Sequence, residues 1–229
     1  MRTGTAFFAT QLGALTDTEL AAASALPDWS RAHVVAHLAR NADALGNLLT
    51  WARTGVETPM YVTAEERATG IEAGAAHAPR QLRLDFDGAA QRLEHAAAGL
   101  ASDAWWANVA TRSGRVIPAA EVPWMRGREV WVHAVDLGAG AKLSDLPPAF
   151  VHALIAETVD GYTARAEVEP IAFTAVDGGA RWLLGVAGPE PMTVQGTAAD
   201  LLGWLLGRTD GDGLSVIGAA ALPSLPTWL

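Results

Sequence analysis

The chain has 229 residues, half of them hydrophobic, and a formal net charge of -9 at pH 7. This length and apolar content suffice for one large domain or two small ones with a sizeable core. The acidic balance argues against nucleic acid or an anionic membrane as a partner, because both require a basic surface. We therefore expect small-molecule partners.

The sequence contains no cysteine. This excludes disulfides, thiolate zinc sites and a cysteine nucleophile, so any thiol chemistry must use a thiol from another molecule. No uncharged apolar run of roughly eighteen residues occurs, and no basic region followed by an apolar segment marks the N-terminus. We therefore expect neither a membrane span nor a secretory signal. A cytoplasmic location and a monomeric state are the default predictions.

Apolar residues at helical spacing predict helices through the first 137 residues. Ser30 is a suitable N-cap for the longest of them, and Gly55 a suitable stop. Thr63 with Glu66 has the spacing of a capping box. Because four of the helices are long and amphipathic, we expect an antiparallel four-helix bundle. The predicted helices cover residues 5–15, 20–25, 31–53, 64–78, 79–100 and about 118–137, with a turn or short hairpin near residues 113–114.

The composition changes after Leu146. Pro147 and Pro148 introduce a helix to about Arg165, and short apolar runs then predict strands, with a hairpin turn at residues 177–179. The predicted fold class is therefore α+β, with a helical domain over residues 1–145 and a small α/β domain over residues 146–229. The expected strands are 171–176, 181–186, 192–195 and 214–217, with a helix over 197–206.

Two helical stretches carry polar side chains on one face. Glu129 and His133 are four residues apart, so a helix would point both at one spot. His33, His37 and Asn41 form a similar stripe on the helix that follows Ser30. A Glu and His four apart are common, and an inward His is more often hydrogen-bonded in a core. Two such stripes nevertheless favour a metal site, because helical bundles build metal sites from inward side chains of neighbouring helices.

Imidazoles with one carboxylate suit zinc. Three protein ligands would leave one position open for water or substrate, as catalytic zinc requires. The residues alone leave the choice between His33 and His37 open.

Three segments and their order resemble those of the mycothiol-dependent maleylpyruvate isomerases, and the likeness runs nearly end to end, including Gly207-Arg208 and residues 226–229. The resemblance implies a DinB-like four-helix bundle followed by a smaller C-terminal α/β domain. The Glu-x-x-x-His motif alone is weak, and the Glu-Thr-Pro-Met-Tyr segment strengthens it. The three segments are residues 29–41, 57–62 and 124–138.

Carried over by position, the resemblance implies that His37, Glu129 and His133 are the zinc ligands, with one zinc per chain. His33 is left out, because related proteins often have a different polar residue there. The resemblance also places the family's essential C-terminal arginine at Arg208. The glycine-rich segment 209–213 that follows is interpreted as a turn, because the rest of a calcium-loop pattern is absent.

The resemblance further implies the reaction. Zinc would lower the pKa of the mycothiol thiol, and the thiolate would add to the double bond of maleylpyruvate. The bond would rotate, and loss of the thiolate would yield fumarylpyruvate. Arg208 could hold a substrate carboxylate, with Arg126 and Arg128 as weaker candidates.

Two other hypotheses remain open. A zinc-dependent transferase could join mycothiol to another electrophile, because its bundle and metal site would look alike. A metal-stabilised binding module is the non-enzymatic alternative. The C-terminal domain with its arginine and the Pro-Met-Tyr loop (residues 59–61) argue against the binding module, because a simple binding module has no need of a second domain that reaches the metal.

Overall fold

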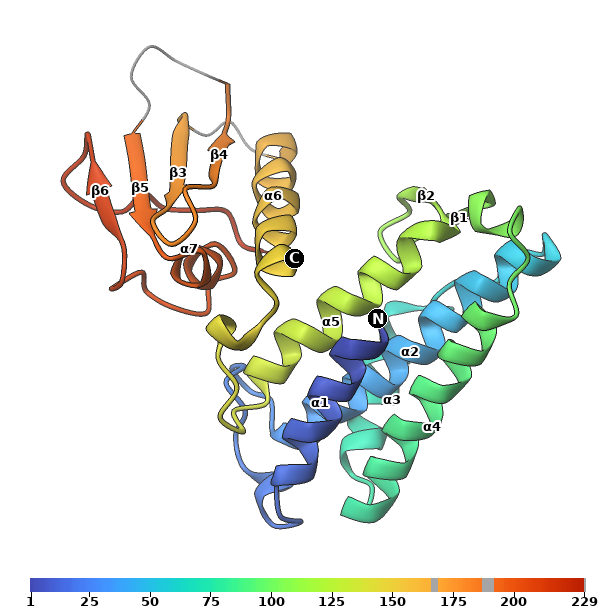
Figure 1. Ribbon diagram of the computed structural model, residues 1–229. Coiled ribbons are helices and arrows are strands. Elements are labelled where there is room, and N and C mark those ends of the chain that lie inside the picture. Colours follow the sequence, from blue (N-terminus) through green and yellow to red (C-terminus); the bar gives the residue numbers. More distant parts are fainter. Residues whose placement is uncertain (166–168, 187–191, 229) are drawn as a thin grey trace. The chain divides into compact units, whose positions relative to one another are not determined.

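A computed structural model describes residues 1–165, 169–186 and 192–228, and the chain divides into two compact units, Met1–Ala141 and Lys142–Leu229 (Figure 1). The division after Ala141 precedes the predicted boundary after residue 145, and a short 3-10 helix, Leu143–Asp145 (η4), lies between them. Leu229, which closes the last segment of the resemblance, lies outside the described residues. The chain thus combines a helical N-terminal region with a small C-terminal sheet region, as the α+β prediction stated.

The N-terminal unit is built around one central helix. Helix α2 packs against α3, α4 and α5, and α1 packs against α5. The sequence predicts four long helices and shorter ones, including one over residues 64–78, and the described residues of this unit form five α-helices. The helices are α1 (Arg2–Ala14), α2 (Arg31–Thr54), α3 (Ala64–Ala75), α4 (Pro79–Ala98) and α5 (Val122–Asp136).

The predicted start and end of α2 and the predicted start of α3 are confirmed, whereas α3 ends at Ala75, before the predicted end at residue 78. Ser30 caps α2 by accepting a hydrogen bond from the backbone N–H of His33, and Gly55 ends it with a φ of 71°. This left-handed conformation is one that glycine adopts without steric cost. The Thr63 hydroxyl accepts the backbone N–H of Glu66, 2.9 Å away, at the start of α3. Local capping chemistry therefore fixes where the central helix begins and ends.

The helix predicted over residues 20–25 is wrong beyond its first turn. Only a 3-10 helix, Glu19–Ala21 (η1), forms there. The chain after it pairs with the residues that precede α2, because the Arg31 N–H donates to the Ala22 carbonyl and the Ser24 N–H to the Trp29 carbonyl. These bonds use the backbone groups that a continued helix would need.

The end of the unit near α5 carries a short hairpin. Strands β1 (Asn108–Ala110) and β2 (Val116–Pro118) pair in antiparallel register, with 3-10 helices η2 (Ala104–Trp106) before them and η3 (Ala119–Glu121) after. The predicted turn is confirmed, with Gly114 at a φ of 81°. The hairpin and η3 lead directly into α5, which carries two of the predicted site residues.

The C-terminal unit contains a four-stranded sheet in the order β4-β3-β5-β6. β3 and β5 are parallel, and the other two pairs are antiparallel. Helices α6 and α7 pack on each other, α7 against β3 and β5 and α6 against β4. The predicted strands and helices are present with small shifts at their ends. They are α6 (Pro148–Arg165), β3 (Ile171–Ala175), β4 (Arg181–Leu184), β5 (Met192–Gly196), α7 (Ala198–Leu205) and β6 (Ser215–Ile217).

Within the described ranges, every helix is too short or too polar to cross a membrane.

Candidate metal centre

Helices α2 and α5 bring the three predicted ligands together. His37 lies on α2, while Glu129 and His133 lie one turn apart on α5. One potential ligand atom from each side chain lies within 4.8 Å of the other two. His37 is buried at 5% exposure, whereas the side chains of Glu129 and His133 keep 20% and 13%. The cluster is therefore enclosed by the helices but reachable on the α5 side.

The distances in the cluster suit a metal ion. The Glu129 Oε2 atom lies 2.9 Å from His37 Nε2 and 3.5 Å from His133 Nε2. Tetrahedral zinc with bonds of about 2.0–2.1 Å holds its donor atoms about 3.3 Å apart. The observed separations bracket this value, and two imidazoles with one carboxylate form a donor set that zinc accepts. The residues present therefore fit a divalent metal.

The two histidines have different partners on their outer nitrogens. His133 Nδ1 lies 2.9 Å from the Asp136 Oδ2 atom, and Asp136 is 1% exposed. A carboxylate there keeps the proton on Nδ1 and leaves Nε2 free to bind a metal. The Nδ1 atom of His37 instead faces a cation, the Arg67 Nη2 atom at 3.3 Å. The carboxylate–histidine pair typical of metal sites is thus present on one side only.

Hydrogen bonding outweighs burial at two of the three groups. Burial alone would lower the pKa of His133, but Asp136 and Glu129 raise it to about 9. For the Glu129 carboxyl, burial has the opposite effect and would raise the pKa. The hydrogen bonds with His133 and His37 nevertheless hold this pKa well below 4.5. For His37 burial dominates and lowers the pKa, against the opposing hydrogen bond with Glu129. At neutral pH the Glu129 carboxylate therefore lies between a charged His133 and a neutral His37.

The rest of the predicted polar stripe on α2 has other roles. His33 Nδ1 lies 2.6 Å from the Ser30 hydroxyl, and its Nε2 lies 3.2 Å from the Glu72 carboxylate. It therefore belongs to the α2 cap and the α3 contact, outside the cluster. The Asn41 Oδ1 atom accepts a hydrogen bond of 2.8 Å from Arg126.

Arg126 joins α5 to α2 one turn before Glu129. Its Nη1 atom donates to the Leu38 carbonyl and to Asn41, both at 2.8 Å, and the side chain is 0% exposed. Burial lowers its pKa to about 10, which still leaves it charged at neutral pH. The sequence offers Arg126 as a weaker candidate for binding a substrate carboxylate. Its position between the helices suits it better to fixing the distance between His37 and the two ligands on α5.

Three residues of this surrounding shell were missed. Asp136 follows His133 by three residues, so the same helical spacing that identified Glu129 could have found it. Arg67 lies thirty residues from His37 in the sequence, and Tyr61 lies in the loop before α3. Only the packing of α3 on α2 brings them near the cluster, and no spacing rule gives that contact.

Arg208 lies in the C-terminal unit just after α7, as predicted. Gly207 ends that helix with a φ of 67°. The Arg208 Nη1 atom donates to the Leu206 carbonyl at 2.9 Å, and its guanidinium lies 5.4 Å from the centroid of the Trp228 ring. The side chain is partly buried. These contacts orient the guanidinium within its unit, and its role in substrate binding stays a prediction.

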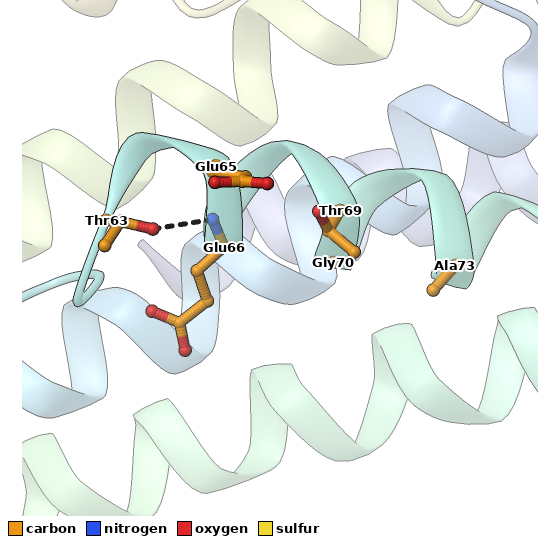
Figure 2. A pocket seen from close by; sticks show the side chains of 6 residues that line it. All are labelled: Thr63, Glu65, Glu66, Thr69, Gly70 and Ala73. Carbon is orange, nitrogen blue, oxygen red and sulfur yellow. Dashed lines mark hydrogen bonds between the residues drawn. The ribbon is translucent and has the colours of Figure 1, made fainter.

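A surface pocket of about 460 Å³ lies on α3 and involves none of the cluster residues (Figure 2). Glu65 and Glu66 give it an acidic lining, and the Glu66 N–H is held by Thr63. An acidic surface repels a dicarboxylate. The pocket therefore does not suit the anionic substrate that the family resemblance implies. It is lined by Thr63, Glu65, Glu66, Thr69, Gly70 and Ala73.

Fold and site together define a class: proteins with a helical N-terminal region that holds a two-histidine, one-carboxylate metal centre, followed by a small mixed sheet. Residues 1–138 match the family described as mycothiol maleylpyruvate isomerase N-terminal domain. The chain belongs to the mycothiol-dependent maleylpyruvate isomerase family.

Solved structures agree over the whole chain. The crystal structure of a mycothiol-dependent maleylpyruvate isomerase matches with 37% sequence identity and a TM-score of 0.92, covering 99% of this chain and 93% of that chain. A histidine-to-alanine mutant of such an isomerase matches with 36% identity and the same TM-score and coverage. No curated protein sequence gives a significant match. The comparisons support an isomerase enzyme.

Proposed function

We propose that this protein catalyses the mycothiol-dependent cis-trans isomerisation of maleylpyruvate to fumarylpyruvate. One observation carries the proposal: His37, Glu129 and His133 converge in a chain that is 37% identical, over nearly its full length, to a mycothiol-dependent maleylpyruvate isomerase. The same site would serve a transferase that joins mycothiol to another electrophile, so the experiment must separate the two.

In this proposal His37, Glu129 and His133 hold one zinc ion per chain. A zinc ion bound there would lower the pKa of a thiol at its open position, which favours the nucleophilic thiolate. Asp136 keeps the His133 ring in the orientation that binds a metal. Arg126 ties α5 to α2 and so keeps the three donor atoms at the observed separations.

The reaction needs a thiolate that leaves again. Addition of the mycothiol thiolate to the double bond of maleylpyruvate makes that bond single, so that it can rotate. Departure of the same thiolate restores the double bond in the trans form, with no net gain or loss of protons. Negative charge develops on the substrate during addition, and nearby cations would stabilise it. We assign the binding of one substrate carboxylate to Arg208, whose guanidinium offers two parallel hydrogen-bond donors.

The direct test follows maleylpyruvate absorbance with and without mycothiol. Turnover is expected only with the thiol, because the chain has no cysteine of its own. Treatment with a thiol-alkylating agent that is then removed should leave the activity unchanged. Full-rate turnover in thiol-free buffer would contradict the mechanism. Consumption of mycothiol in proportion to substrate, with a stable thioether product, would replace the isomerase by the transferase.

We also propose four further features of this protein. They are the DinB-like four-helix arrangement within the helical unit, the assignment of the metal to residues 1–145, a cytoplasmic location and a monomeric state.

A further inference from the structure

We infer that Arg67 and Tyr61 form an anion-recognition site beside the metal cluster, which takes a carboxylate of a cis-dicarboxylate substrate. The inference deepens the proposed function and rests on it for the identity of the substrate. The site itself is defined by contacts within the N-terminal unit.

The position of Arg67 is the first observation. It lies in the first half of α3, and its Nη2 atom is 3.3 Å from His37 Nδ1. The Arg67 side chain is half-buried, whereas His37 is 5% exposed. The guanidinium therefore touches the metal cluster and keeps access to solvent. A ligand reaching the cluster on this side would meet a positive charge.

The second observation is that Arg67 lacks a carboxylate partner among the residues that the structure describes. Three other arginines of the unit form close ion pairs. Arg40 lies 2.7 Å from Asp85, Arg92 lies 2.7 Å from Asp43, and Arg115 lies 3.0 Å from Glu121. Arg67 instead contacts the His37 imidazole at 3.3 Å and the Tyr61 hydroxyl. A guanidinium carries five N–H donors, so most of its binding capacity is left for a ligand.

A metal bound by His37 would change its contact with Arg67. His37 Nε2 faces Glu129, so a metal bound by Nε2 would leave the ring proton on Nδ1. Arginine has only donors, and an N–H of Arg67 cannot bond to a protonated Nδ1. Metal binding at the cluster therefore frees the Arg67 guanidinium for an acceptor. A substrate carboxylate is such an acceptor.

Tyr61 supplies the second donor. Its hydroxyl lies close to the Arg67 guanidinium, and the ring is half-buried in the loop before α3. Burial raises the pKa of Tyr61 against the opposing effect of Arg67, so the hydroxyl stays protonated at neutral pH. A guanidinium and a phenol side by side present donors to both oxygens of one carboxylate. This role would explain why an aromatic residue with a polar tip occupies the loop.

The test measures binding as well as activity. Zinc-loaded protein without mycothiol is titrated with maleate, an unreactive cis-dicarboxylate in the absence of thiol, by isothermal calorimetry. Loss of a charge-assisted contact should raise the dissociation constant of Arg67→Gln roughly 10- to 100-fold. Arg67→Lys and Tyr61→Phe should each raise it roughly 3- to 10-fold. Arg53→Gln, which removes the same charge from an exposed position on α2, is the matched control and should bind like wild type.

Metal content and kinetics separate recognition from support of His37. All four variants should keep one zinc per chain. The KM for maleylpyruvate should rise with the maleate dissociation constant, while kcat changes less than roughly threefold. Wild-type maleate affinity in Arg67→Gln, no maleate binding by the wild type, or loss of zinc from Arg67→Gln would each overturn the inference. If the wild type binds maleate through Arg67 but does not isomerise maleylpyruvate, the proposed function fails and the anion site stands.

Discussion

The two units of the chain use buried polar groups in different ways. In the N-terminal unit, His37, Asn41, Arg126 and Asp136 are all at most 5% exposed, and they lie in or next to the metal cluster. Apart from the hydroxyl of Tyr162, the described part of the C-terminal unit has one buried polar side chain, Thr158, whose hydroxyl donates to the Leu154 carbonyl of its own helix. Burying charge is costly unless it is paired. Because these buried charged groups all lie in the N-terminal unit, we expect the reactive site to lie there.

The contacts differ in kind as well as in number. In the N-terminal unit, side chains on different helices bond to each other, as His37 does with Glu129 and Asn41 with Arg126. In the C-terminal unit, the buried Tyr162 hydroxyl donates to the Leu205 backbone carbonyl, 2.6 Å away. Such bonds stabilise a fold without creating a site. From this comparison we expect metal binding to depend on the first unit alone and the C-terminal contribution to reside in Arg208.

The largest effect should come from the cluster itself. Replacing His37, Glu129 or His133 by alanine removes one of three ligands, so each variant should lose the single zinc ion. Activity should fall by about three orders of magnitude or more, as when a principal electrostatic group is removed. Metal analysis by mass spectrometry after zinc-supplemented expression, together with the maleylpyruvate assay, measures both.

His33 provides the matched control on the same helix. His33→Ala removes an imidazole that faces Ser30 and Glu72 outside the cluster. Most of the metal should remain. A wild-type chain without zinc, or an indispensable His33 beside a dispensable His37, would refute the assignment of the metal centre.

The second-largest effect should come from Arg208, the residue that we assign to substrate binding in the C-terminal unit. Arg208→Lys keeps the charge but removes the paired donors of the guanidinium. We expect normal zinc content and normal mycothiol binding, with activity on maleylpyruvate lower by about two orders of magnitude. Loss of zinc from this variant would show that the metal centre depends on the C-terminal unit. Activity near wild type would remove Arg208 from the mechanism.

Sequence periodicity accounts for more of the fold than of the site. Ser30 and Gly55 bound α2 because capping depends on neighbours in the chain. Glu129 and His133 meet because four residues make about one helical turn. The choice of His37 over His33 came from family resemblance, since both share a helical face. Which of them meets α5 depends on how the helices pack.

The contacts of Arg67 and Arg126 likewise could not be predicted from sequence periodicity. Each joins residues that lie far apart in the sequence, and each depends on the relative rotation of two helices. The short helix predicted over residues 20–25 was wrong for a related reason. Pairing of the backbone with the segment before α2 replaced the local helical preference.

A smaller effect is expected from the partner of His133. Asp136→Asn keeps the size of the side chain but removes the charge that orients the ring. Zinc affinity should fall about 10- to 100-fold, as for loss of an outer-shell carboxylate. Competition with a zinc-binding dye measures this affinity, and Arg53→Gln again serves as the control for a surface charge change. An unchanged affinity would mean that Glu129 alone orients His133.

The smallest effect concerns stability and distinguishes the two histidines without any metal. The pKa of His133 is raised from 6.5 to about 9 in the folded protein. Its stabilising contribution is therefore fully present below pH 6.5 and is lost as the pH rises to about 9. The pKa of His37 is lowered, so this ring is neutral in both the folded and the unfolded chain at pH values well above 6.5 and adds little slope there. After zinc removal by a chelator, the free energy of unfolding in urea should fall by about 1–3 kcal/mol between pH 6.5 and 9.

Asp136→Asn should reduce this dependence of stability on pH, because it removes the first hydrogen bond that raises the His133 pKa. A flat profile for the chelated wild type would contradict a charged His133, and a slope that survives in His133→Ala would assign the proton to another group.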